Sequence, residues 1–429
     1  MLKHMRYTAV MLAVMMCLTG CGATAERTTD VKRNSIIVWT WDESFNVKAV
    51  RMAAGKYNLT HPDTEIIVEV KENEKVMEDV KNILIARDYQ RLPDIIMIED
   101  YDAQDMLSLY ADDFVDLTDK IPADRFVEYK TEVCSRDNTL YGIPFDSGVA
   151  ALFYRCDILE AAGFTEQDMQ NLTWEEYIAI GKQVKEKTGT AMLTLDPTDL
   201  PLVRLIMQSE GKWYVDSDGT TVTIKDNSVL KYSLQIMRQM LEDNIGISAN
   251  GWNDFITAFQ KNQVATVVSG GWIISSLKEN QEQSGKWRVA RIPSASGEKD
   301  SAVSNVGGSA WYILKKSAMC EQATDFAVST FGLDDELMNE LVEAIGIIPT
   351  TTQMAEYDNL RKEDPFFGGT QVSGFLAEMC DEMPVINYGR KTYEIEDIIE
   401  QEFQGYLVNN DLENTLEKAQ MKAEAVAKE

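Results

Sequence analysis

The residue types that most often carry acid–base and nucleophilic chemistry are scarce in this chain. It has two histidines, and because His4 falls in the N-terminal segment, His61 is the only one left for the body of the protein. A Ser-His-Asp hydrolase would depend on this residue, which lies in the turn-like segment Thr60–Asp63. The sequence contains no HExxH, GxSxG, Walker A or GxGxxG motif. The usual hydrolytic and nucleotide-dependent reactions therefore lack their characteristic residues.

Carboxylates are abundant, and for that reason they say little about catalysis. The chain has 70 Asp and Glu against 41 Lys and Arg, a formal net charge of −29. Close pairs of carboxylates therefore arise by chance. A surface this acidic repels nucleic acids and anionic lipids and would not attract phosphorylated substrates. We expect no nucleic-acid partner.

The cysteines favour neither a metal site nor a disulfide framework. Six are present, and two of them, Cys17 and Cys21, belong to the N-terminal segment. The others are scattered without CxxC spacing, so we expect no metal site; they are Cys134, Cys156, Cys320 and Cys380. A chain of this size does not need disulfides for stability, which favours free thiols over the alternative of one or two bridges.

Residues 1–20 have the order of features found in a signal peptide. Lys3 and Arg6 precede an apolar stretch that ends at Leu18. This stretch is shorter than the roughly 20 residues that span a bilayer core, which favours a cleaved signal over a membrane helix. The chain is therefore expected to be exported.

The end of this signal is similar to the lipobox of bacterial lipoproteins. Leu18-Thr19-Gly20 stands directly before Cys21. The resemblance implies cleavage after residue 20 and a lipid on Cys21, and residues 21–34 would form a polar tether. The alternative is a plain secretory signal followed by a chance cysteine.

Strands and helices are expected to alternate in the first part of the chain. Apolar runs predict strands at 36–41, 64–70 and 94–98, and helical spacing predicts helices at 46–59 and 74–87. Such alternation predicts a doubly wound α/β lobe, in which ligands bind at the carboxyl ends of the strands. Trp41–Glu43 and Glu99–Tyr101 would lie at this rim.

The rest of the chain is more helical. Thr173 and Glu176 form a predicted capping box. Asp216–Gly219 reads as a hairpin turn, because the later ligands of a calcium loop are missing. Residues 395–428 have helical apolar spacing. About 400 residues after export are too many for one simple core and suit two packed lobes.

Several segments, in their order and spacing, resemble the carbohydrate-binding group of the extracellular solute-binding proteins of ABC importers. The most specific stretch is Leu140–Asp146 followed by Leu152–Arg155. The other matching segments are Ile37–Trp41, Tyr57–Asp63, Leu92–Ile96, Thr173–Tyr177, Ser269–Trp272 and Gly307–Trp311. The resemblance extends from about Ile36 to Pro349.

This resemblance implies a two-lobed α/β fold of the periplasmic-binding-protein-like type II, with a ligand cleft between the lobes. Hinge strands would cross near Phe145–Asp146, near Val303–Gly307 and near Ile345–Pro349. The expected first lobe is 31–145 plus 306–346, and the expected second lobe is 146–305 plus 347–429.

A sugar site needs planar aromatic rings for the C–H faces and carboxylates or amides for the hydroxyls. With the family as a guide, both types occur at strand ends and in loops. The expected ligand-binding residues are Trp41, Asp42, Glu43, Asp100, Asp146, Trp252, Asp254, Trp272, Trp311 and Phe366.

Each aromatic residue also has a structural interpretation. Trp39 and Trp41 alternate on one strand, and we expect Trp41 to face the cleft. Trp252 could equally staple a helix start, core packing competes strongly at Trp311, and Phe366 could cover the hinge. Trp174, Trp213 and Trp287 are expected to be structural.

The resemblance implies a monomeric binding protein, without metal, cofactor or catalysis, on the outer face of a membrane. It would capture a neutral mono- or oligosaccharide and deliver it to an ABC permease, and its lipid would be its only contact with the membrane. The alternatives are a secreted glycan-cleaving enzyme with two carboxylates, a sugar-sensing subunit of a membrane receptor, and a binder of a peptide or polyamine.

Overall fold

The computed structural model describes residues 35–122, 124–298 and 302–428. The predicted signal peptide, Cys21 and residues 21–34 lie outside these ranges. In the described part of the chain no helix is both long and apolar enough to cross a membrane.

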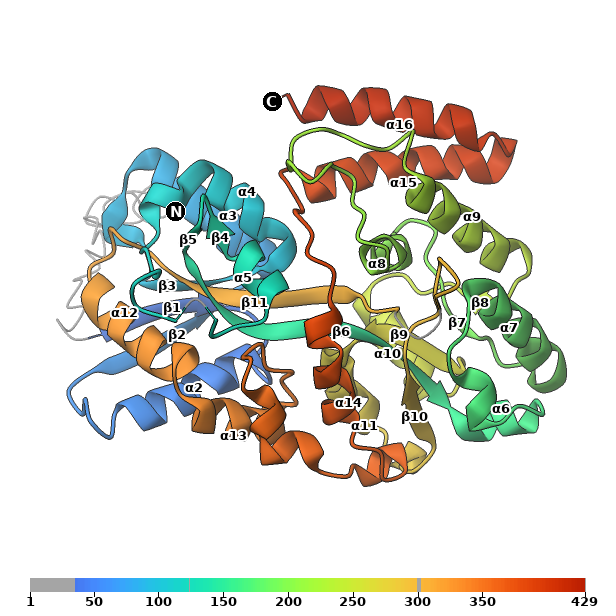
Figure 1. Cartoon of the computed structure of the whole chain (residues 1–429), viewed down its shortest axis with the longest axis horizontal. Helices are drawn as coiled ribbons and strands as arrows, with labels where there is room; N and C mark the ends of the chain where they lie inside the picture. The colour runs from blue at the N-terminus through green and yellow to red at the C-terminus, as the bar shows by residue number, and fades with distance from the viewer. Residues whose placement is uncertain (1–34, 123, 299–301, 429) are drawn as a thin grey trace, which may run out of the picture. The chain divides into compact units, whose positions relative to one another are not determined.

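The first sheet forms from the three apolar runs. They become β1 (Ser35–Thr40), β2 (Glu65–Val70) and β3 (Ile95–Glu99), with α2 (Asn46–Tyr57) and α3 (Asn73–Ala86) between them. All five predicted elements are confirmed within two residues at each end. β1 and β3 are parallel neighbours, and in Figure 1 α2 lies on one side of this sheet and α3 on the other. The sheet continues through β11 (Asn305–Ile313), which runs antiparallel to β3.

One long strand belongs to two sheet regions. β6 (Gly142–Arg155) pairs through its first half with β11, where Ile143 lies opposite Trp311. Its second half pairs with β9 (Thr266–Gly270) and β10 (Trp287–Ala290). Figure 1 shows β6 and β11 side by side along the path between the two regions. The fold is the expected two-lobed α/β fold with strands that pass between the lobes.

The three expected crossings meet at the middle of β6. Asp146 forms a β-bridge with Pro349, and the Ser147 N–H donates to the Ile348 carbonyl at 2.9 Å. On the other side, Ser309 of β11 lies opposite Asp146. The passages near 145, 305 and 348 are therefore adjacent.

The other predicted local features are confirmed. At the start of α7 (Trp174–Thr188), the Glu176 N–H donates to Thr173 Oγ1 at 3.2 Å and the Thr173 N–H to Glu176 Oε2 at 2.9 Å. Around the 216–219 turn, the Asp216 N–H donates to the Thr221 carbonyl at 2.8 Å. The C-terminal stretch is helical, as predicted, and it forms two helices because Asn410 takes a left-handed conformation (φ 57°) that ends the first one.

The remaining elements complete both lobes. The helices are α4 (Asp100–Tyr110), α5 (Glu128–Val133), α6 (Cys156–Ala161), α8 (Pro201–Ser209), α9 (Ser228–Glu242), α10 (Trp252–Gln260), α11 (Ile274–Lys278), α12 (Cys320–Ala327), α13 (Asp335–Ile345), α14 (Val372–Glu378), α15 (Thr392–Asn409) and α16 (Leu412–Val426). The short strands are β4 (Ser135–Arg136), β5 (Thr139–Leu140), β7 (Leu193–Thr194) and β8 (Gly246–Ile247).

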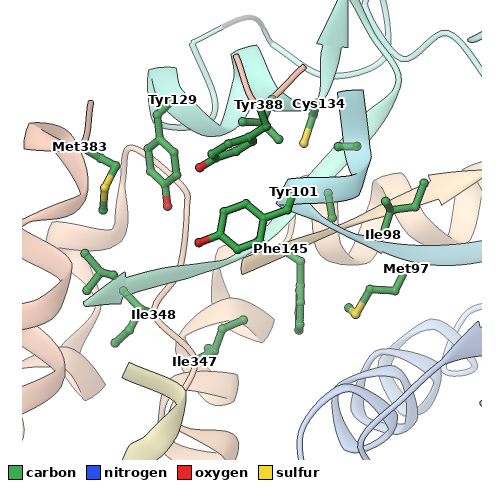
Figure 2. Packing of buried hydrophobic residues seen from close by; sticks show 14 of the residues in the cluster. Met97, Ile98, Tyr101, Tyr129, Cys134, Phe145, Ile347, Ile348, Met383 and Tyr388 are labelled. Carbon is green, nitrogen blue, oxygen red and sulfur yellow. The ribbon is translucent and has the colours of Figure 1, made fainter. Parts of the chain in front are cut away.

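A hydrophobic core runs through the crossing region. Figure 2 shows Tyr101, Phe145 and Ile348 packed together with Tyr129 and Tyr388, so that five segments of the chain meet there. The three tryptophans expected to be structural are buried. The four cysteines of the described chain are free thiols, as expected, and Cys134 and Cys380 are buried.

Candidate functional site

A cavity of about 1010 Å³ opens beside the crossing strands. Its lining comes from segments far apart in the sequence: the loop after β1, the ends of β3 and β9, the middle of β6 and the start of β11. Helices α8, α10 and α15 also contribute to the lining. The site therefore lies where the crossing strands and the strand ends come together.

Trp41 and Asp42 line the cavity directly after β1. Asp42 has a positive φ of 56°, and its Oδ1 accepts from the Ser44 N–H at 2.8 Å and the Phe45 N–H at 3.0 Å. The carboxylate thus stabilises the turn that leads into α2. Trp39 is buried within β1 and donates through Nε1 to Glu69 Oε2 at 2.8 Å. Trp41 follows the last residue of β1, Thr40, and is the one of the two that lines the cavity.

Three aromatic rings from α10 and the segment after β9 form one wall. The ring of Trp252 lies 5.5 Å from that of Trp272 and 5.6 Å from that of Phe255. Trp272 is fixed because its Nε1–H donates to the Val306 carbonyl at 2.9 Å. Trp252 stays 53% exposed. Such a wall offers flat apolar area to the face of a ring-shaped ligand.

Asp146 lies at the crossing point and lines the cavity. Its Oδ1 accepts a hydrogen bond of 2.5 Å from Ser309 Oγ, and burial raises its pKa. Gly308 next to it has φ 89°, and a Cβ there would lie 2.8 Å from Asp100 Oδ2. Only glycine fits this position, which brings the β11 backbone against the two carboxylates.

Glu99 closes the end of β3. Its Oε2 accepts from Asn73 Nδ2 and from the Tyr393 hydroxyl, both at 3.1 Å. Burial and the negative charge of Asp102 raise the pKa of Glu99 to about 7. Asn73 and Tyr393 also line the cavity, so residues of β3, α3 and α15 meet here.

Arg204 of α8 is a cation at the wall, and most of its charge is already matched. It pairs with Glu396, which also accepts from the Tyr214 hydroxyl at 2.6 Å. Its guanidinium lies 5.5 Å from the ring centre of Tyr101 and 5.8 Å from that of Tyr393. Most other charged side chains of the lining are carboxylates, so the cavity disfavours anionic ligands.

Five of the ten predicted ligand-binding residues line the cavity; they are Trp41, Asp42, Asp146, Trp252 and Trp272. Three polar ones do not. Asp100 is buried below the cavity in an ion pair with Lys130. Glu43 is exposed and pairs with Arg51 at 3.3 Å, and Asp254 is exposed on α10 away from the lining.

Trp311 and Phe366 lie in the core, which corrects their expected place in the cleft. A register shift between Ser309 and Ala310 breaks the strand alternation, so Ser309 reaches Asp146 while Trp311 stacks on Phe331 at 5.0 Å. Trp311 is fully buried. Phe366 is in a short 3-10 helix (Pro365–Phe367) that turns its ring inward, and it is 4% exposed.

Sequence reasoning missed Asn73, Arg204 and Tyr393. Arg204 sits in an apolar helix and Tyr393 in the first turn of α15, far along the chain, with no motif around either. Glu99 and Tyr101 were expected only as general rim residues. The rule that ligands bind at the carboxyl ends of parallel strands predicted their position. It does not predict which residues of the other lobe contact them.

The comparisons with known proteins agree with this geometry. Residues 28–367 match the model of a family described as bacterial extracellular solute-binding protein. The lactose-binding protein of Rhizobium radiobacter is 36% identical over 403 residues, which cover 94% of this chain and 93% of that protein. The arabinooligosaccharide-binding protein of Bacillus subtilis (strain 168) is 24% identical over 399 residues, 89% of each.

A solved structure gives the same result for the fold. The ABC transporter associated binding protein from B. animalis subsp. lactis Bl-04, in complex with beta-1,6-galactobiose, superposes with a TM-score of 0.73 at 22% identity. The match covers 92% of this chain and 98% of that one. The two chains therefore share a fold over nearly their whole lengths.

Proposed function

Because this chain belongs to the bacterial extracellular solute-binding proteins, we propose that it captures a neutral mono- or oligosaccharide outside the cell and delivers it to an ABC permease. The observation that carries the sugar proposal is the cavity, where an aromatic wall of Trp252, Phe255 and Trp272 faces the same space as the carboxylates of Asp146 and Glu99. Rings would stack on the wall and hydroxyls would donate to the carboxylates.

The size of the cavity favours a short oligosaccharide over a single sugar ring. Its 1010 Å³ lies at the upper end of the roughly 300–1,000 Å³ typical of small-molecule sites. The lactose-binding relative makes a β-galactoside disaccharide the first ligand to test. The two cations of the lining, Arg204 and Lys278, are already paired with Glu396 and Asp364, so an acidic sugar would find little positive charge to pair with.

A thermal-shift panel tests this proposal. Lactose, beta-1,6-galactobiose and arabinooligosaccharides are each added in excess, because a ligand that binds only the folded chain raises its melting temperature. At 100 times the dissociation constant the gain is about 2.7 kcal/mol, which is several degrees. A response to peptides or polyamines, with silence across neutral glycans, would overturn the sugar proposal.

The binding role of the relatives supports capture without cleavage. After a day with lactose at 37 °C, chromatography should recover the disaccharide intact, and release of galactose would support the glycan-cleaving alternative instead. Transport and sensing are separated in cells. Deletion of the gene should abolish uptake of the labelled sugar; unchanged uptake with a lost transcriptional response would favour a receptor subunit.

We also propose that the first lobe consists of residues 31–145 and 306–346, and the second lobe of residues 146–305 and 347–429. The passage of β6 from one sheet region to the other supports them. Ligand-driven closure about these strands should reduce the radius of gyration in X-ray scattering when lactose is added. A scattering curve unchanged by a saturating ligand would argue against closure.

Anchoring by a lipid on Cys21 and a monomeric state complete the proposal. The signal-like residues 1–20 support the anchor. Labelled palmitate should be incorporated into the wild-type protein and not into Cys21→Ser, which should appear in the medium or periplasm. Retention of the variant in the membrane fraction would contradict the anchor, and a dimer in size-exclusion chromatography would contradict the monomer.

A further inference from the structure

The two carboxylate oxygens of Glu99 are used unequally. Oε2 accepts from both Asn73 Nδ2 and the Tyr393 hydroxyl. Within the residues that the structure describes, Oε1 accepts no hydrogen bond. A methyl group built on Gly307 would lie 3.4 Å from this Oε1. The free oxygen therefore faces a position where the chain has no side chain.

Trp272 borders the same position from the other side. The point where a Cβ of Gly307 would lie is 3.8 Å from Trp272 Nε1. Gly307 has φ 83°, a conformation that favours glycine, so the space between the indole and the carboxylate is kept open by the backbone itself. All three residues line the cavity.

Resting on the proposed function, we propose that Glu99 determines the orientation and specificity of the bound sugar, with Oε1 accepting a hydrogen bond from a hydroxyl of the ring that lies against Trp272. The ligand class is a neutral sugar whose ring offers a hydroxyl donor at the edge next to its stacked face. A sugar that carries a carboxylate at this edge would meet Glu99 and be rejected.

The carboxylate is held in place before any ligand binds. Asn73 comes from the first turn of α3 and Tyr393 from the first turn of α15, so two elements from distant parts of the chain fix Oε2. A fixed acceptor costs little ordering when the ligand binds. Oε1 is then left pointing to one place, which suits selection among hydroxyl positions.

The charges around Glu99 give the proposal a pH signature. Asp100 and Asp102 face it from α4, Arg204 from α8 and the Tyr393 hydroxyl from α15; α3 contributes the neutral Asn73, and β11 contributes Gly307. Hydroxyl donation to the ionised form is stronger than to the neutral acid. Because the pKa of Glu99 is raised to about 7, lactose affinity should rise between pH 6 and pH 8.

Glu99→Gln is the sharpest variant. Two donors point at the Oε2 position, so the amide oxygen of glutamine will occupy it and the NH₂ group will face Gly307. The hydrogen-bond acceptor that Oε1 offers to the ligand is thus replaced by an NH₂ donor, while the side-chain volume hardly changes. Glu132→Gln is the matched control, because Glu132 is an exposed lobe-one carboxylate outside the cavity.

Calorimetric titration with lactose and with beta-1,6-galactobiose, at pH 6 and pH 8, tests the proposal. We expect the wild-type protein to bind about threefold more tightly at pH 8 than at pH 6. Glu99→Gln should lose at least tenfold in affinity at pH 8, and its affinity should not depend on pH. Glu132→Gln should bind as the wild-type protein does. Circular dichroism confirms folding. Should Glu99→Gln fail to fold, Glu99→Asp withdraws the carboxylate by one methylene and should lose affinity similarly.

The outcomes separate the two proposals. If wild type binds either sugar and the folded Glu99 variant stays within twofold of it, the role of Glu99 is overturned and the proposed function stands. If wild type binds neither sugar, the role of Glu99 toward them is overturned too. If it then also fails to respond to the arabinooligosaccharides of the thermal-shift panel, the proposed function falls with it.

Discussion

The ammonium group of Lys130 and the carboxylate of Asp100 form an ion pair in the interior, where their side chains are 0% and 1% exposed. Lys130 also donates to the Ser309 carbonyl at 3.1 Å, and Asn305 Nδ2 donates to Asp100 Oδ2 at 3.3 Å. Burial raises the pKa of Asp100 to about 6 although Lys130 opposes the shift. The pair ties α4 and α5 to β11 directly below the cavity.

Lys130→Met should destabilise the protein by about 3–5 kcal/mol, because it leaves a buried carboxylate without its partner. The double variant Asp100→Asn with Lys130→Met should recover much of this loss. Urea denaturation followed by circular dichroism measures both. Lys75→Met is the control, since Lys75 pairs with Glu78 on the surface and such pairs contribute about 0–1 kcal/mol. A buried variant no less stable than this control would contradict the prediction.

Glu99→Gln should raise the melting temperature at pH 8 and leave it unchanged at pH 4. The pKa of Glu99 is about 7 in the folded chain against an ordinary value of 4.5. From pH 4.5 upward the unfolded chain loses a proton that the folded chain still holds, so the carboxylate destabilises the fold increasingly until about pH 7. A neutral glutamine has no such cost. Melting curves without ligand from pH 4 to pH 8 test this. A difference in melting temperature between variant and wild type that does not change with pH would contradict the prediction.

Asp146→Ala should weaken sugar binding without unfolding the protein. Removing a charged acceptor costs roughly 1.5–3 kcal/mol of binding, which is tenfold or more in Kd. The Ser309 hydroxyl loses its acceptor as well, so a modest drop in melting temperature is expected. Calorimetry with lactose measures the effect, and unchanged affinity would remove Asp146 from the site.

Trp252→Ala should mainly weaken sugar binding, whereas Trp311→Ala should mainly destabilise the fold. Trp252 is half exposed at the cavity, so its loss should cut affinity by about 2 kcal/mol or more with little change in stability. Trp311 is fully buried against Phe331 and Phe145, so its loss should cost about 3–5 kcal/mol of stability. Calorimetry and urea denaturation of both variants give the comparison. Equal stability of the two would contradict the assignment of Trp311 to the core.

The first lobe could be predicted closely because its signals are local. Runs such as Ile95–Ile98 are apolar on both faces, as a strand covered on both sides requires, and the helices between them keep a 3.6-residue spacing. The expectation that Trp41 faces the cleft agrees with its place directly after β1, where the chain leaves the sheet and Trp41 lines the cavity. These features need only a few neighbouring residues to be read.

Five of the ten predicted site residues line the cavity, and the places of the others have identifiable causes. Trp311 was placed in the cleft because nothing in the sequence marks the register shift after Ser309 that turns it inward. Arg204 and Tyr393 meet Glu99 and Tyr101 only through tertiary packing. Periodicity carries no information about which distant segments converge.

The pairing of β3 with β11 sets an order on how the chain can fold. Met97 lies opposite Trp311, and Val38 opposite Ile95, so the sheet around β3 lacks one neighbour until residue 311 has been synthesised. Neighbours so far apart in sequence form late and slowly, since a long loop must close first. The first sheet is therefore completed only after β6, β9 and β10, which belong largely to the other sheet region, have already been synthesised.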